Sequence, residues 1–394
     1  MSEARPYDVV LFGATGFTGR LVAEALARRS LETPLRFALA GRNAEKLEGV
    51  RAELAAGGLA TGRVGLIEAD ARDAGSLLRM AAQGRVLVST VGPYLRTGLA
   101  VVEACVQAAT DYADITGEPA FVAKTIERFH EPARVAGIRV VSCCGFDSLP
   151  HDLGVLFTVD RLGSTGAIEV EGRVRTRGTF SGGTLDTALD IFSRPLRTGS
   201  TALDRHPPPA PGRRVRSAAL GIRRLPGEGW LVPMPTIDPK IVLRSARFDG
   251  RYGADFRYAH LLQLGSLPTV LAAGIGVSAL LGLAQLPPAR SLLRRIREPG
   301  DGPSQAQRDR AWFHLRFVGR SGGRTVVTEV RGGDPGYTET SKMLAESALC
   351  LAFDRERLPD RSGVLTPACA MGAPLIERLH SVGIRFEEVP PSAA

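Results

Sequence analysis

Three closely spaced glycines near the start of the chain limit what its first part can fold into. They lie in Gly13-Ala14-Thr15-Gly16-Phe17-Thr18-Gly19, between an apolar run at Val9–Phe12 and a helical pattern that extends to about Arg29. The first glycine allows a tight turn, the second allows a ligand to approach the backbone, and the third allows the helix to pack closely on the strand. This pattern predicts a strand–turn–helix unit.

The same alternation of short apolar runs and amphipathic helical patterns continues to about residue 141. Further strands are expected at 35–40, 64–67, 86–90, 112–115 and 138–141, with helices at 43–54, 74–82, 98–109 and from 118 onward. Such alternation is typical of βαβ units and a parallel sheet. The prediction is therefore an α/β protein whose residues 1–150 form an N-terminal Rossmann domain, a doubly wound parallel sheet.

Beyond about Leu153 the pattern changes. Polar and apolar residues alternate at 167–174, 312–318 and 324–330, which predicts exposed antiparallel strands, and residues 205–229 and 298–307 have the composition of loops. The prediction is a second, α+β domain over residues 151–365, which carries the substrate.

The glycine turn at the start of a helix predicts a dinucleotide site. Free amides and the positive end of the helix dipole attract a pyrophosphate. The residues expected to line this part of the site are Gly13, Thr15, Gly16, Phe17, Thr18 and Gly19.

The end of the second predicted strand indicates which dinucleotide is bound. It reads Leu39-Ala40-Gly41-Arg42-Asn43 and lacks the acidic residue that binds ribose hydroxyls in NAD-specific domains. Arg42 can pair with a 2′-phosphate and Lys46 lies one turn further on, so the predicted cofactor is NADP(H). The alternative for Arg42 is a surface arginine at the start of a helix.

Two further strand ends are expected to approach the same cofactor. The fourth strand is followed by Thr90, Val91, Gly92 and Pro93, which are expected near the nicotinamide ribose because ligands lie beyond the carboxyl ends of the strands. Asp70, after the third strand, is expected either near the adenine or as a helix cap.

Residues 261–289 contain no charged side chain and are followed by Arg290, Arg294, Arg295 and Arg297. Three interpretations stay open: a buried core helix, a peripheral contact with a membrane through an apolar element with an arginine rim, and a membrane-spanning helix. The length is marginal for a span, which ranks last.

Composition excludes several other classes of protein. The N-terminus has no signal-peptide pattern, so we expect a cytoplasmic protein, with membrane association left open. Five cysteines without a C-x-x-C pair and six histidines without ligand spacing predict neither disulfides nor a metal site. The net charge of +9 favours an anionic partner or reflects only an arginine bias, and no nucleic-acid-binding motif is present. The oligomeric state is open, with a homodimer as one option.

Several segments together resemble the saccharopine dehydrogenase-like oxidoreductases, especially their trans-acting enoyl reductase branch. These segments are residues 13–19, 40–42, 91–94, 111–118, 144–154, 181–184, 332–337 and 363–367. The most specific is Gly145-Phe146-Asp147-Ser148-Leu149-Pro150. The resemblance implies a nicotinamide cofactor, a C-terminal helix within 366–394 that returns to the Rossmann domain, and reduction of a carbon–carbon double bond in a lipid or polyketide-like substrate.

Enoyl reduction needs a proton donor beside the hydride acceptor, and three residues are candidates. Tyr94 follows the fourth strand, Asp147 follows the last Rossmann strand, and Tyr337 lies in a glycine-rich turn. Each has a structural alternative: a pocket wall for Tyr94, a helix cap for Asp147 and a packed ring for Tyr337. Asp114, Thr116 and Glu118 are expected to orient substrate or to begin a helix.

The sequence thus favours an NADPH-dependent oxidoreductase acting on a small, lipid-like enoyl or ketone substrate. Two alternatives stay open: a saccharopine-type amino-acid dehydrogenase, and a non-catalytic NADP(H)-binding protein at a lipid surface. The uncharged segment 261–289 favours the lipid-like substrate over the amino acid.

Overall fold

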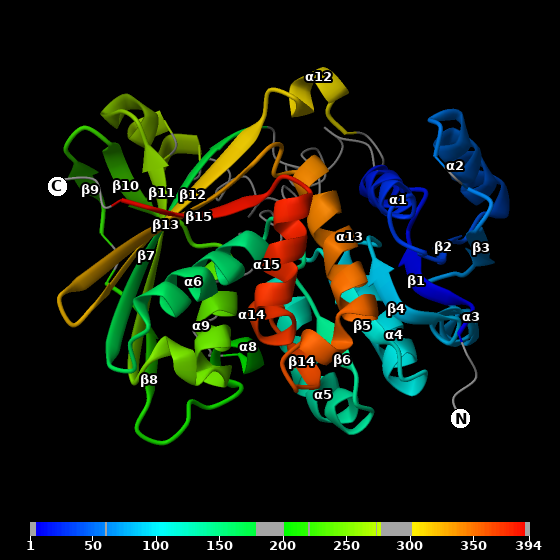
Figure 1. The fold of residues 1–394 in the computed structure, drawn as a ribbon, viewed down its shortest axis with the longest axis horizontal. Helices are drawn as coiled ribbons and strands as arrows, with labels where there is room; N and C mark the ends of the chain where they lie inside the picture. The colour runs from blue at the N-terminus through cyan, green and yellow to red at the C-terminus, as the bar shows by residue number, and fades with distance from the viewer. Residues whose placement is uncertain are drawn as a thin grey trace. The chain divides into compact units, whose positions relative to one another are not determined.

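A computed structural model describes residues 5–59, 61–178, 201–219, 221–272, 274–276 and 302–390. The chain divides into two compact units (Figure 1). Unit 1 comprises Met1–Leu149 and Tyr337–Gly383, and unit 2 comprises Pro150–Gly336 and Ile384–Ala394. The family motif at 181–184 lies outside the described residues.

Unit 1 contains a seven-stranded parallel sheet in the order β14-β6-β5-β4-β1-β2-β3. Its strands are β1 (Tyr7–Phe12), β2 (Phe37–Gly41), β3 (Val64–Glu68), β4 (Gly84–Ser89), β5 (Asp111–Asp114), β6 (Arg139–Val141) and β14 (Gly363–Leu365). The order reverses direction at β1, which creates the switch point where doubly wound sheets bind ligands. The apolar residues of β1 and β4 are fully buried, as expected for a parallel sheet covered on both faces.

Helices follow the strands of this sheet in the predicted alternation, which confirms the Rossmann fold. They are α1 (Phe17–Arg29), α2 (Ala44–Ala56), α3 (Ala74–Ala81), α4 (Tyr94–Gln107), α5 (Pro119–Val135), α13 (Thr338–Phe353), α14 (Pro367–Ala370) and α15 (Gly372–Ser381). The strand predicted at 112–115 and the helix predicted from 118 agree with β5 and α5 to within one residue.

The return of the chain to unit 1 begins at Tyr337, earlier than the expected segment 366–394. Helix α13 is buried along almost its whole length and contacts α1, β4, β5 and α15. Its Glu346 side chain is 1% exposed, with Oε1 2.9 Å from Arg29 Nε on α1 and Oε2 3.6 Å from Arg378 Nη1 on α15. One buried carboxylate therefore joins three helices of unit 1.

Unit 2 contains an eight-stranded mixed sheet in the order β15-β13-β12-β7-β11-β10-β9, with β8 paired to β11. Its strands are β7 (Ala167–Arg177), β8 (Arg214–Ser217), β9 (Arg223–Leu225), β10 (Gly229–Pro233), β11 (Asp255–Leu264), β12 (Trp312–Ser321), β13 (Arg324–Gly332) and β15 (Arg385–Val389). Its described helices are α6 (Leu149–Leu162, whose first residue belongs to unit 1), α8 (Ala202–Arg205), α9 (Asp238–Phe248) and α12 (Gln305–Arg308).

Two expectations for this region need correction. The segment 167–174 is not an exposed antiparallel strand, because β7 lies inside the sheet, parallel to β11 and antiparallel to β12. Its alternating charges are mostly buried as partners: Arg173 Nε lies 2.8 Å from Glu171 Oε1, and Arg173 Nη1 lies 3.0 Å from Glu228 Oε2. The segment 205–229 is likewise more than a loop, because it contains β8 and β9.

The uncharged segment 261–289 begins as the end of β11 and continues as helix at 267–272 and 274–276. Along this helix Leu267, Leu271 and Ile275 recur every four residues and are 47%, 59% and 72% exposed. These side chains are not part of a core, and residues 277–289 lie outside the described part of the chain. Among the described residues, no helix has the length and apolar character needed to span a membrane.

The buried carboxylate on α13 gives a stability prediction for unit 1. Glu346→Ala should lower the free energy of unfolding by about 3 kcal/mol, because it leaves two largely buried guanidinium groups without this partner. The matched control is Glu377→Ala, which removes an exposed pair with Arg357 and should cost less than about 1 kcal/mol. Urea unfolding monitored by circular dichroism measures both, and equal losses would contradict the joining role of Glu346.

Candidate active site

The glycine turn between β1 and α1 is fixed by two very close approaches. Gly13 has φ +92°, and a Cβ atom there would lie 2.7 Å from Thr90 Oγ1. A Cβ atom on Gly19 would lie 2.1 Å from the Gly13 carbonyl oxygen. Gly16 differs, since its φ is −74° and its Cβ would approach nothing closer than 3.5 Å. The packing of the chain requires the first and third glycines, whereas room for a ligand explains the second.

The first turn of α1 is open to an anion. Its N-cap is Gly16, which has no side chain to accept hydrogen bonds from the first amides, and no acidic residue lies in this turn. The amides of Thr18 and Gly19 thus face the positive end of the helix dipole without a capping side chain. Thr15 and Phe17 complete the half-exposed rim of the turn.

Thr90 connects this turn to the end of β4. Its amide donates to the Phe12 carbonyl at 3.0 Å, and its hydroxyl donates to the Gly13 carbonyl at 3.2 Å. Val91 is half-buried, and Gly92 and Pro93 are exposed at the same edge of the sheet. The structure therefore brings all four residues of the predicted nicotinamide side next to the glycine turn.

Arg42 lies directly after β2 and is exposed. The start of α2 is capped by Asn43 instead, whose Oδ1 accepts a 2.8 Å hydrogen bond from the Lys46 amide. In the part of the chain that the structure describes, neither the Arg42 guanidinium nor the exposed Lys46 ammonium has a hydrogen bond or ion pair. Both cations are available at the carboxyl edge of the sheet.

Asp70 is not a helix cap, because α3 is capped by Asp73, which accepts from the Gly75 amide at 2.9 Å. The Asp70 carboxylate binds Arg72 at 3.0 Å. Hydrogen bonds from the Arg72 side chain and amide, followed by the more remote charge of Arg42, lower the pKa of Asp70 to about 2. A lasting negative charge therefore lies near Arg42.

Tyr94 faces the interior of unit 1. Its side chain is 7% exposed, and its hydroxyl donates to the Ser89 carbonyl at 3.0 Å. Burial, with a smaller contribution from Asp114, raises the pKa of Tyr94 well above its usual value. This environment favours the pocket-wall role for Tyr94.

The polar residues after β5 bind backbone amides. The Glu118 carboxylate accepts hydrogen bonds from the Tyr94 and Leu95 amides at 2.8 and 3.0 Å, so it caps α4 rather than its own helix. Asp114 is fully buried and accepts from the Thr116 amide at 3.0 Å. Burial raises the pKa of Asp114 to about 6, although hydrogen bonds oppose the shift.

Asp147 and Tyr337 lie on two segments that meet. Asp147 is half-buried in the connection after β6, where the Phe146 amide donates to Thr340 Oγ1 of α13 at 3.0 Å. Tyr337 is the N-cap residue of α13, and its ring packs edge-on against Phe17 of the glycine turn with ring centroids 4.8 Å apart. The sequence gave no signal for this contact, because 320 residues separate the two rings.

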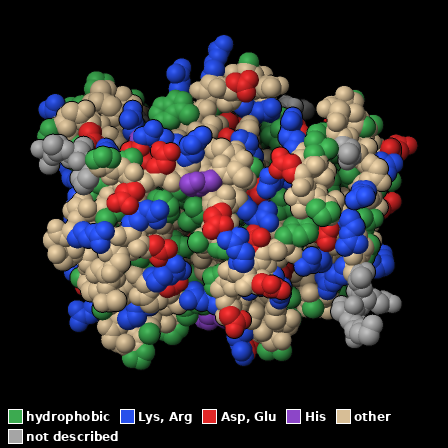
Figure 2. All heavy atoms as spheres, viewed as in Figure 1, with side chains coloured by type: hydrophobic (Ala, Val, Ile, Leu, Met, Phe, Trp, Pro, Cys, Tyr) green, Lys and Arg blue, Asp and Glu red, His purple; other side chains and the backbone are tan. Residues whose placement is uncertain are grey.

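Charges on the surface are mixed. On the face shown in Figure 2, lysine and arginine side chains are interspersed with aspartate and glutamate and do not form one continuous basic patch. Many pairs are local, such as Arg28 with Glu24 and Arg51 with Glu48. The net charge of +9 is therefore dispersed on this face.

Comparisons with known proteins agree with this geometry. A family model of the saccharopine dehydrogenase NADP binding domain matches residues 9–141. A trans-acting enoyl reductase of Mycobacterium ulcerans is 37% identical, covering 97% of this chain and 98% of its own. One of Mycobacterium tuberculosis is 38% identical and covers 98% of both chains. The fold resembles apo saccharopine dehydrogenase (L-Glu forming) of Saccharomyces cerevisiae, with a TM-score of 0.54 at 12% identity over 98% of this chain.

The position of Tyr94 leads to a prediction that separates its two roles. Tyr94→Phe should lower the free energy of unfolding by about 1 kcal/mol, because the buried Ser89 carbonyl loses its hydrogen-bond donor, while turnover and NADPH affinity should persist. Urea unfolding and steady-state NADPH oxidation measure the two effects. A loss of turnover of tenfold or more at unchanged NADPH affinity would instead identify Tyr94 as a catalytic residue.

Proposed function

The chain belongs to the trans-acting enoyl reductase family and is an NADP-dependent oxidoreductase, and on this basis we propose that it reduces a carbon–carbon double bond in a lipid or polyketide-like substrate. The observation that carries the proposal is the pairing of an uncapped glycine turn with an exposed arginine and lysine after β2. The turn suits a diphosphate, and the two cations suit a 2′-phosphate.

The residues of the glycine turn fit the cofactor. A side chain at Gly16 would meet no close atom of the chain, so the space beside the α1 amides is available to phosphate oxygens. Arg42 and Lys46 would hold the 2′-phosphate, with Asp70 on the adenine side. Thr90, Val91, Gly92 and Pro93 would line the nicotinamide ribose. When bound, NADPH supplies the hydride.

The remaining step is delivery of a proton to the substrate. Addition of hydride to the β-carbon leaves negative charge on the α-carbon and its carbonyl, which a nearby donor must neutralise. We assign this role to the Tyr337 hydroxyl, because the Tyr337 ring packs against Phe17 of the glycine turn. Asp147 is the second candidate, since it lies in the connection whose Phe146 amide binds α13.

A lipid-like substrate is supported by the exposed apolar helix face of unit 2. Leu267, Leu271 and Ile275 lie on one side of the described helix and are all exposed. Arg290 and further arginines follow in the sequence. An apolar face followed by basic residues suits a peripheral contact with an anionic membrane. We propose that this face contacts lipid.

Cofactor preference tests the role of Arg42. Arg42→Ala should weaken NADPH binding by at least about tenfold, because a guanidinium–phosphate pair contributes more than 1.4 kcal/mol, and should leave NADH binding nearly unchanged. Fluorescence titration with both nucleotides measures this, and Arg51→Ala on the same helix α2 is the matched control. Equal weakening of both nucleotides by Arg42→Ala would refute the assignment.

The reaction itself is tested by NADPH oxidation with three substrate arms. We expect activity with a long-chain enoyl thioester and none with saccharopine or lysine plus 2-oxoglutarate. Activity only with the amino-acid substrates would favour the amino-acid dehydrogenase, and binding of NADPH without oxidation in any arm would favour the non-catalytic protein.

Lipid contact is tested by co-sedimentation with phosphatidylglycerol vesicles. The double variant Leu271→Glu/Ile275→Glu should lower the bound fraction at least about tenfold, because each apolar side chain contributes about 1.5–3 kcal/mol when transferred from water. Leu31→Glu changes an equally exposed leucine of unit 1 and should have little effect. Equal binding of all three proteins would overturn the proposed contact.

A further inference from the structure

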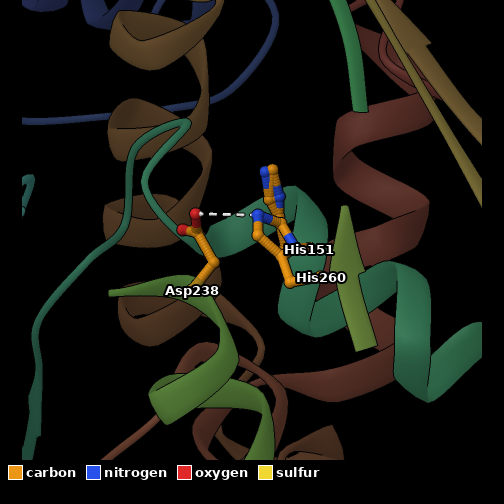
Figure 3. Close-up of side chains that lie close together, drawn as sticks. All are labelled: His151, Asp238 and His260. Atoms are coloured by element: carbon orange, nitrogen blue, oxygen red, sulfur yellow. Dashed lines mark ion pairs between the residues drawn. The ribbon is translucent and has the colours of Figure 1, made fainter. Parts of the chain in front are cut away.

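Unit 2 contains a buried cluster of two histidines and one aspartate that the reductase chemistry does not use. His151 comes from the first turn of α6, Asp238 is the first residue of α9, and His260 lies in β11 (Figure 3). The three residues are 1%, 1% and 2% exposed. Each offers one potential ligand atom, and these atoms all lie within 4.8 Å of one another.

The contact between His260 and Asp238 has the spacing of two ligands on one ion. His260 Nε2 lies 3.3 Å from Asp238 Oδ2. Two ligands of a tetrahedral zinc ion, each about 2.0–2.1 Å from the metal, are about 3.4 Å apart. Since the full cluster spans at most 4.8 Å, a side-chain shift of about 1.5 Å suffices to bring the third ligand to the same distance.

The protonation of His260 supports a cation between these two atoms. Its Nδ1 lies 2.9 Å from the Tyr258 hydroxyl. Its Nε2 is buried and, among the described residues, makes no hydrogen bond, because the 3.3 Å contact lacks the required geometry. With the ring proton on Nδ1, a lone pair of Nε2 faces a carboxylate oxygen, and a shared cation would turn this repulsion into two bonds.

Groups around the cluster hold the ligands in place. The Thr236 hydroxyl donates to Asp238 Oδ2. The Met234 amide donates to the His260 carbonyl at 3.1 Å, which fixes the β10–α9 connection to β11. The His151 and His260 rings lie edge to face with centroids 5.0 Å apart. Hydrogen bonds of this kind orient the ligands in protein metal sites.

We propose that His151, Asp238 and His260 bind one divalent transition-metal ion, with Zn²⁺ as the best chemical match, and that the ion joins α6, α9 and β11. Two imidazoles and a carboxylate suit Zn²⁺, and the fourth position would take a water molecule. The burial of all three ligands indicates a structural rather than a catalytic ion. The sequence predicted no metal site because its ligands are separated by 87 and 22 residues.

The test is metal binding by the intact chain. After treatment with a chelator, the wild-type protein should bind one Co²⁺ with the intense visible absorption of a tetrahedral site, and Zn²⁺ should displace it. His260→Gln and His151→Gln should each weaken Zn²⁺ binding at least 100-fold. The matched control is His314→Gln, which removes a histidine 3.1 Å from Glu329 that belongs to no such cluster, and it should leave binding unchanged.

Two results would overturn the proposal. One is a folded wild-type protein that binds neither ion stoichiometrically, which would leave a hydrogen-bonded cluster only. The other is Zn²⁺ binding that both cluster variants retain. Circular dichroism checks the fold of each variant, and if neither folds, the Co²⁺ spectrum of the wild type decides the question.

Discussion

The contact between Gly19 and the Gly13 carbonyl is the constraint on which the cofactor site depends. Any side chain at Gly19 would push α1 away from the end of β1. With the helix drawn in, its first amides lie at the carboxyl edge of the sheet, next to the point where the strand order reverses. Close packing of one helix thereby creates both the turn and an anion site, without any charged side chain in the turn.

Other parts of unit 1 hold this edge of the sheet in position. Thr90 binds the turn to β4, and Glu118 caps α4 from the following loop. The returning helix α13 packs along α1, and its buried Glu346 connects α1 with α15. Because α13 also begins at Tyr337, the same helix stabilises the nucleotide-binding unit and brings a tyrosine to the glycine turn.

Local patterns in the sequence were sufficient for the first 150 residues. Each strand there is an apolar run and each helix is amphipathic, so β1 to β6 and their helices follow from periodicity. Contacts between distant segments could not be read in this way. The strand β14 joins β6 from residues 363–365, and the Tyr337–Phe17 pair is equally remote. In β7, Glu171 and Arg173 have the pattern of an exposed strand, but they are buried as an ion pair. Sequence periodicity detects polarity and cannot tell a solvated charge from a paired one.

The central claim is that the α1 amides bind a diphosphate while Arg42 and Lys46 bind a phosphate on the adenosine ribose. Calorimetric titration of the unmodified chain with NADPH and with NADH tests it most directly. The account predicts one NADPH site per chain and an NADH affinity at least about tenfold lower, since the two nucleotides differ only by the 2′-phosphate. Failure to bind either nucleotide, or tighter binding of NADH, would contradict it.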